Sequence, residues 1–325
     1  MTPPRILLQT SARLRSSGGR GSGTLLAAAA MFLGFSLVAD RFASLPNLIN
    51  LAKQMSIVGV LGVGMTIVVL VGGIDLSVGS IVLLSGAVAG PLLLEGFGAA
   101  AAIPAAILAG TAVGVANGWL VERLRISPVI VTLGTMIAVR GLALVLLERY
   151  RSWIDINDPV FDALGSGSIL GVPATALILT VVAGLSAMLL RMTTIGREMY
   201  AVGDNAVAAR LCGVDVARVR SFAYVTSGTL AGIAGILSMV RTAVVSPSIG
   251  VGLEFSAVTV VVLGGARLSG GAGSVEETIV GAAMLVMVLN FLTINGVPGT
   301  WQTTVTGGLI LLAVVLKRGL GQSAA

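Results

Sequence analysis

The sequence of 325 residues has no histidine, one cysteine and two lysines, and only 10% of its residues are charged. Without histidine, the chain can form neither a histidine metal site nor a serine–histidine triad. The single cysteine, Cys212, excludes an internal disulfide. Soluble domains carry about 25% charged residues, so this chain has too few charges to cover a water-exposed surface.

What the sequence does contain is apolar. Hydrophobic residues make up 56% of the chain, and the mean hydropathy is +1.02, which indicates an integral membrane protein. The 44 glycines are about twice the usual ~7%, and glycine lets membrane helices approach closely. The net charge of +6 comes from basic residues in short loops between apolar segments, which is typical of membrane topology rather than nucleic-acid binding.

Ten apolar segments predict an all-α integral membrane protein with about ten transmembrane helices. Most have the length needed to cross ~30 Å of hydrocarbon. The shortest, 255–265, is expected to be a broken or re-entrant element, which is tolerated only where protein or a water-filled cavity surrounds it. The predicted segments are 24–39, 49–71, 76–94, 99–121, 128–147, 173–190, 221–240, 255–265, 275–294 and 301–316.

The arginines predict the orientation and the domain limits. Residues 1–23 contain four arginines and no acid, and we expect them to form a disordered cytoplasmic tail. A cleaved signal peptide is the alternative, but the many later spans favour a retained first helix. A single transmembrane domain then covers 24–318, and a cytoplasmic tail covers 319–325. Both termini and the 191–220 loop are expected inside, and the 148–172 loop outside.

The segment "VGGIDLSVGS", residues 71–80, places a carboxylate within an apolar region. A charge at bilayer depth costs a few kcal/mol or more, so Asp75 needs a role. One interpretation is a helix cap at a tight turn, in which Asp75 and Ser77 hydrogen-bond freed backbone groups and the flanking glycines permit unusual dihedrals. The other is a polar element that lines a substrate path.

Three more polar residues lie in apolar segments: Asn117, Arg140 and Asn290. The two asparagines predict hydrogen bonds between helices more readily than ligand contacts. Arg140 either extends to the membrane interface or pairs with an acid on a neighbouring helix, for which Asp75 and Glu254 are candidates.

The two remaining glycine-containing loops differ in what they predict. The 263–274 loop, "LGGARLSGGAGS", lacks the order of a phosphate-binding loop, so we expect no ATP site and no cofactor on this chain. In the inner loop, "NAVAARLCGV" predicts a short surface helix from Ala206 to Leu211, with its N-cap at Asp204 or Asn205 and a stop at Gly213.

Four motifs in order resemble the permease subunits of ribose-type bacterial ABC importers, the branch that includes xylose, arabinose, rhamnose and autoinducer-2 permeases. "GGIDLSVGS" is similar to the hallmark of that family, and "TLGTMIAVRGLALV" to its Thr-Leu-Gly…Arg-Gly segment. "TTIGREMYAVGDNAVAARLCGVDVARVR" resembles its cytoplasmic coupling region, and "VLGGARLSGGAGS" its late loop. The resemblance covers about 45–318. Asp204, Cys212 and the pair Glu276–Glu277 depart from the common pattern.

The resemblance implies an ABC importer permease fold and a division of labour. Two permease chains, identical or homologous, form the pore; two cytoplasmic ATP-binding cassette subunits drive it; and a periplasmic binding protein delivers a neutral monosaccharide. The alternatives are a self-contained secondary transporter or channel, or a permease for autoinducer-2, a nucleoside or a branched-chain amino acid. The residues implied to couple to the ATPase are Gly196, Arg197, Gly203, Asn205, Ala208, Ala209 and Gly213.

Overall fold

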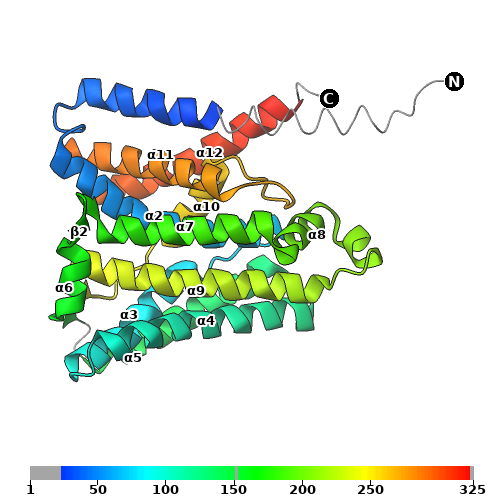
Figure 1. The fold of residues 1–325 in the computed structure, drawn as a ribbon, viewed down its shortest axis with the longest axis horizontal. Coiled ribbons are helices and arrows are strands. Elements are labelled where there is room, and N and C mark those ends of the chain that lie inside the picture. Colours follow the sequence, from blue (N-terminus) through cyan, green and yellow to red (C-terminus); the bar gives the residue numbers. More distant parts are fainter. Residues whose placement is uncertain (1–22, 151–152, 323–325) are drawn as a thin grey trace.

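The computed structural model describes residues 23–150 and 153–322, and they are mostly helical (Figure 1). The predicted helical membrane fold is confirmed. After a first helix, Gly23–Val38, the helices are α2 (Leu45–Leu70), α3 (Val78–Leu94), α4 (Ala99–Leu124), α5 (Pro128–Glu148), α6 (Pro159–Ser166), α7 (Ala174–Met192), α8 (Thr194–Leu211), α9 (Val216–Thr242), α10 (Leu253–Leu263), α11 (Val275–Ile294) and α12 (Gly299–Gln322).

Each of the ten predicted segments falls on a helix, but the helices differ in length. Six of those described, α2, α4, α5, α7, α9 and α11, are long and apolar enough to cross a membrane, whereas the first helix, α3 and α10 are shorter. Ten crossings therefore stay a prediction. Of the predicted N-terminal tail, only Gly23 is described, and it begins the first helix; residues 323–325 also lie outside the described residues. The helix α12 continues to Gln322, past the predicted limit at 318.

Two helices form the centre of the molecule. In α2 and α9, 83% and 78% of the most apolar window is buried, against 22% in α5 and 28% in α7. Glycines allow α4 to lie directly on α9, because a Cβ on Gly110 or Gly114 would overlap the Gly228 or Tyr224 carbonyl oxygen. The outward faces of α5 and α7 carry large apolar side chains such as Ile137 and Leu185.

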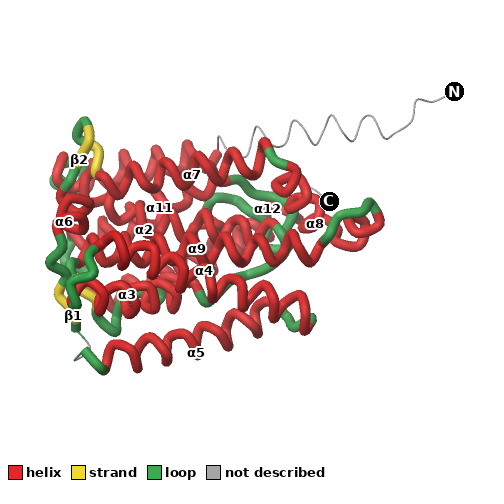
Figure 2. The backbone as a smooth tube through the Cα atoms, turned by 60° about the horizontal axis from the view of Figure 1, so that its bottom comes forward, coloured by secondary structure: helices red, strands yellow, loops and turns green. Residues whose placement is uncertain are grey.

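The two ends of the bundle have different structures. One end carries α6 and two small antiparallel pairs: β1 (Ile154–Asp155) with β4 (Val244–Val245), and β2 (Ser168–Ile169) with β3 (Val172–Pro173). The opposite end carries α8, and α7 and α9 run between the two ends (Figure 1, Figure 2). The 148–172 segment, expected on the outer side, is thus folded, apart from residues 151–152, which lie outside the described residues.

Candidate functional site

The helix α8 has a break at the place where the sequence predicted a helix start. Asn205 has non-helical dihedral angles (φ −157°, ψ 99°), and its Oδ1 accepts hydrogen bonds of 3.0 Å from the backbone N–H groups of Val207 and Ala208. Asn205, rather than Asp204, is therefore the cap of the predicted short helix. Gly213, with φ +87°, follows the end of the helix, as expected for a stop.

The first part of α8 was not predicted from the sequence. It begins at Thr194, after Thr193 accepts a 3.1 Å hydrogen bond from the Gly196 N–H group. Gly196 is buried against the end of α7. The approach is so close that a Cβ at this position would overlap the carbonyl oxygens of Leu189 and Leu190. Arg197 and Ala208 are exposed, whereas Ala209 is buried. The predicted coupling residues thus include both inward-facing and outward-facing positions.

A contact made almost wholly of glycine joins α8 to the end of α2. A Cβ on Gly203 would overlap the Leu70 carbonyl oxygen, which accepts a 3.0 Å hydrogen bond from the Gly271 N–H group. A Cβ on Gly270 would lie 2.8 Å from the Gly203 oxygen and 3.1 Å from the Gly72 Cα. We call these residues, Gly72, Gly203, Gly270 and Gly271, the glycine junction.

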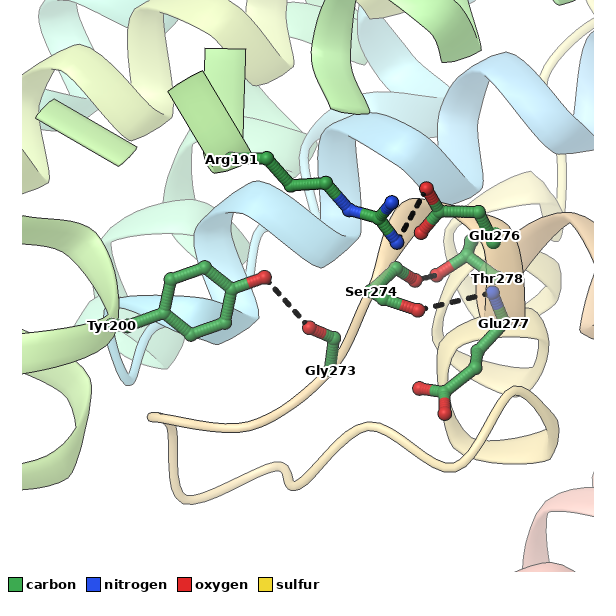
Figure 3. Close-up of polar contacts among 7 residues, drawn as sticks. All are labelled: Arg191, Tyr200, Gly273, Ser274, Glu276, Glu277 and Thr278. Carbon is green, nitrogen blue, oxygen red and sulfur yellow. Dashed lines mark hydrogen bonds and ion pairs between the residues drawn. The ribbon is translucent and has the colours of Figure 1, made fainter. Parts of the chain in front are cut away.

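Polar contacts hold the 264–274 loop between α8 and α11 (Figure 3). The Tyr200 hydroxyl of α8 donates a 2.9 Å hydrogen bond to the Gly273 carbonyl oxygen, and Arg191 at the end of α7 forms a 2.9 Å ion pair with Glu276. Burial raises the pKa of the Tyr200 phenol, with a further contribution from the Glu276 carboxylate, so the phenol stays a donor. Ser274 caps α11 by accepting from the Glu277 N–H group at 3.2 Å.

The Asp75 carboxylate lies in a fully buried polar cluster just beyond this junction. Its Oδ1 accepts from the Ser77 N–H group at 3.0 Å and from the Ser77 hydroxyl at 2.6 Å, and its Oδ2 accepts from the Ser227 hydroxyl of α9 at 2.8 Å. Asn117 of α4 donates to the Ser77 Oγ at 2.9 Å. Asp75 thus stabilises the turn before α3, and it ties three helices together.

The five polar residues singled out from the sequence lie at three places: Asp75, Ser77 and Asn117 share the cluster above, whereas Asn290 and Arg140 lie elsewhere. Asn290 exchanges two hydrogen bonds, of 3.0 and 2.9 Å, with Asn47 at the start of α2. Arg140 contacts the Ile249 carbonyl oxygen at 3.4 Å and interacts electrostatically with Glu254. Ser227 could not be identified from the sequence, because a serine within an apolar helix commonly bonds its own backbone.

A cavity of about 780 Å³ lies at the α8 end, between the segment before α3 and the start of α9. Its lining includes Gly72, Gly73 and Tyr224, together with charged residues of both signs, namely Glu122, Arg125, Arg210, Asp215 and Arg220. Glu122 and Arg220 approach to 3.5 Å. Three of these charged residues are arginines and two are acids, so the lining carries a net charge of +1.

Comparison with known proteins decides the family. Residues 47–314 match the profile of the family described as "Branched-chain amino acid transport system / permease component". The chain belongs to this permease family. Membership makes it a transport permease component and a multi-pass membrane protein, and not a catalytic enzyme.

Several curated relatives of this permease are similar over most of their length. The ribose import permease protein RbsC of Escherichia coli K12 is 36% identical over 264 residues, 81% of this chain and 82% of the relative. RbsC of Bacillus subtilis is 34% identical over 283 residues (87% and 88%), and the L-arabinose ABC transporter permease protein AraH of Azospirillum brasilense is 34% identical over 295 residues (88% and 86%). These matches confirm the resemblance to sugar ABC permeases. No solved structure matches the chain.

Proposed function

We propose that this permease carries a neutral monosaccharide across the inner membrane as the membrane subunit of an ABC importer. The names of the relatives, ribose and arabinose permeases, support the solute class. The observation that carries the coupling role is α8, whose exposed second part presents Val207 and Leu211 while its first part packs on the glycine junction. ATP is bound by separate cytoplasmic ATP-binding cassette subunits, and these subunits contact the exposed second part of α8.

The contacts of α8 give a physical route for this coupling. A displacement of α8 acts on Leu70 through Gly203, and Gly72 follows Leu70 by two residues. The Asp75 cluster, three residues further, joins α3, α4 and α9. Movement at the cytoplasmic end therefore reaches the central helices through packed backbone, and alternating access follows when they tilt. A second permease chain completes the pore, and a periplasmic binding protein docks at the end that carries α6.

The coupling role is tested by charging the exposed part of α8. We expect Val207→Asp with Leu211→Asp to abolish uptake of radiolabelled ribose by the complete transporter and to prevent co-purification of the ATPase subunits. The matched control is Val207→Leu, which keeps the surface apolar and should retain both activities. Since both side chains are exposed, the doubly charged chain should still insert. Uptake at the wild-type rate in this variant would reject the coupling assignment.

A second solute class follows from the family description, which names branched-chain amino acids. Competition separates the two classes: an excess of unlabelled ribose or arabinose should reduce uptake, whereas leucine should not. A self-contained transporter is the remaining alternative. We expect the purified chain alone, in vesicles, to move no ribose with or without an ion gradient. Both termini are proposed to face the cytoplasm, on the same side as α8.

A further inference from the structure

Two short apolar helices of this permease begin with related segments. Residues 73–78 read GIDLSV before α3, and residues 252–257 read GLEFSA at the start of α10. Glycine and serine are identical in the two segments, and the acid, the aliphatic residue before it and the apolar residues after it are of similar kind. Each segment follows one of the two most buried helices, α2 or α9. The order of elements α2–α5 therefore repeats in α9–α12.

The two copies run in opposite directions. The helix α2 ends beside α8, where the Leu70 carbonyl oxygen meets Gly203 and Gly271. The helix α9 ends at the other end of the bundle, where β4 pairs with β1. Inverted repeats of this kind in transporters hold their solute near the bilayer midplane, at discontinuous helices in corresponding positions of the two halves.

The two related segments, at the starts of α3 and α10, meet in the structure. A Cβ on Gly79, in the first turn of α3, would overlap the Gly250 carbonyl oxygen and the Glu254 carboxylate. A Cβ on Gly250, which has φ +80°, would overlap the Gly79 carbonyl oxygen. Backbone lies on backbone here, and the Glu254 side chain points at the start of α3.

The two acids differ in their hydrogen bonds. Three donors reach the Asp75 carboxylate, as described above. Glu254 is 6% exposed, and its Oε2 has no hydrogen-bond partner among the described residues. Arg140 acts electrostatically on this carboxylate, but no ion pair joins the two within the described part of the chain. Toward the residues that the structure describes, the guanidinium makes one long hydrogen bond, at 3.4 Å, although it has five N–H donors.

An unpartnered buried carboxylate oxygen is unfavourable, and the cost disappears when a donor reaches it. A sugar hydroxyl is such a donor, and its oxygen can also accept from a guanidinium. The pair carries no net charge, so it suits a neutral polyol better than an anion or a cation. Ser246 and Ser248, whose hydroxyls lie 2.9 Å apart just before Ile249, add further polar groups to this side of α10.

We propose that Glu254 and Arg140 bind hydroxyl groups of the transported sugar where the two broken helices meet. The inference rests on the proposed function. In the present conformation the Glu254 carboxylate abuts Gly79, so this site is closed, and separation of α10 from α3 opens it. Asp75, at the corresponding position of the other repeat, stabilises the turn before α3 and joins it to α9, and it takes no part in sugar binding.

The test compares Glu254→Gln and Arg140→Gln with Glu148→Gln and Arg149→Gln, two exposed positions at the outer end of α5. Uptake of radiolabelled D-ribose by the complete transporter is measured over a range of concentrations, with 2-deoxyribose and 3-deoxyribose as competitors. We expect at least a tenfold loss of Vmax/KM for Glu254→Gln and for Arg140→Gln. Preference for ribose over one deoxy analogue should fall at least fivefold in Glu254→Gln, because one hydroxyl has lost its acceptor. Glu254→Asp should recover part of both, and the two controls should keep the wild-type preference among the analogues.

A charge exchange distinguishes sugar binding from a simple gate. If Arg140 and Glu254 only contact one another during the cycle, Arg140→Glu with Glu254→Arg should restore uptake, and that result would overturn the proposal. Unchanged analogue preference in a Glu254→Gln chain that reaches wild-type levels in the membrane would also overturn it. Neither result affects the proposed function, which fails instead if the wild-type transporter takes up neither ribose nor arabinose.

Discussion

The short helices α3 and α10 of this permease begin with similar sequences, but the acids in these two segments differ in how fully they are hydrogen-bonded. At the start of α3, three donors satisfy the Asp75 carboxylate, and the cluster is fully buried. At the start of α10, one oxygen of Glu254 has no partner among the described residues. A carboxylate whose bonds are complete stabilises the fold, whereas one whose bonds are incomplete is available to a ligand. The same local motif thus serves structure in one half and, we infer, transport in the other.

The largest expected effect separates the two acids by stability. Asp75→Ala should lower the free energy of unfolding by about 2–4 kcal/mol, since hydrogen bonds to a charged acceptor contribute about 1.5–3 kcal/mol each. Glu254→Ala should change it by less than about 1 kcal/mol while it abolishes uptake. Thermal unfolding of the purified chains in detergent measures both. Equal losses of stability in the two variants would remove the contrast.

The next largest loss of stability is expected where the starts of α3 and α10 meet. Gly79→Ala and Gly250→Ala should each destabilise the chain by about 1–3 kcal/mol, because the added methyl meets backbone atoms that cannot turn away. The double variant should lose less than the sum, since both methyl groups disturb one contact. As a control, Gly184→Ala in α7, where nothing lies within 4 Å, should gain about 0.5–1 kcal/mol. Strict additivity at 79 and 250 would contradict the contact.

The serines of the two segments are expected to differ from one another by a smaller amount than the two acids do. The Ser77 hydroxyl donates to Asp75 and accepts from Asn117, so Ser77→Ala should cost about 1.5–3 kcal/mol. The Ser256 hydroxyl makes one hydrogen bond of 3.3 Å, to the Gly252 carbonyl oxygen, so Ser256→Ala should cost roughly 0.5 kcal/mol. The same unfolding measurement ranks them, and a larger loss at Ser256 would reverse the assigned roles.

The smallest effect is expected far from both broken helices. Arg191 and Glu276 form an exposed ion pair, with 66% and 49% of their side chains accessible. Arg191→Gln should therefore cost less than about 0.5 kcal/mol, and the loss should vanish in high salt. The preference among sugars should not change. A shift in that preference would mean that the α8 end and the sugar site are coupled more directly than these contacts indicate.

The sequence predicted the features that depend on local chemistry. The cap at Asn205 and the stop at Gly213 follow from residue type, and Asp75 is conspicuous because it is a charge in an apolar segment. The ten apolar segments all correspond to helices. These inferences needed no knowledge of which helices are neighbours.

The features that the sequence did not predict depend on packing. The first part of α8 contains Gly196 and Gly203, which disfavour a helix in isolation, and close contact with α7 and α2 overrides that preference. Asn290 makes the interhelical hydrogen bond expected of it, but its partner, Asn47, lies 243 positions away and could not be named from the sequence. Which hydroxyl reaches Asp75, and that no hydrogen-bond partner among the described residues reaches the Glu254 Oε2, is decided by helix neighbours far apart in the chain.

The glycine junction has a consequence for how force passes through the permease. Side chains in an interface can change rotamer and so absorb small shifts, but backbone atoms in direct contact cannot. A displacement of α8 is therefore transmitted to the end of α2 almost undiminished. If ATPase subunits act on α8 as proposed, the contact between α8 and α2 adds no delay of its own to pore opening.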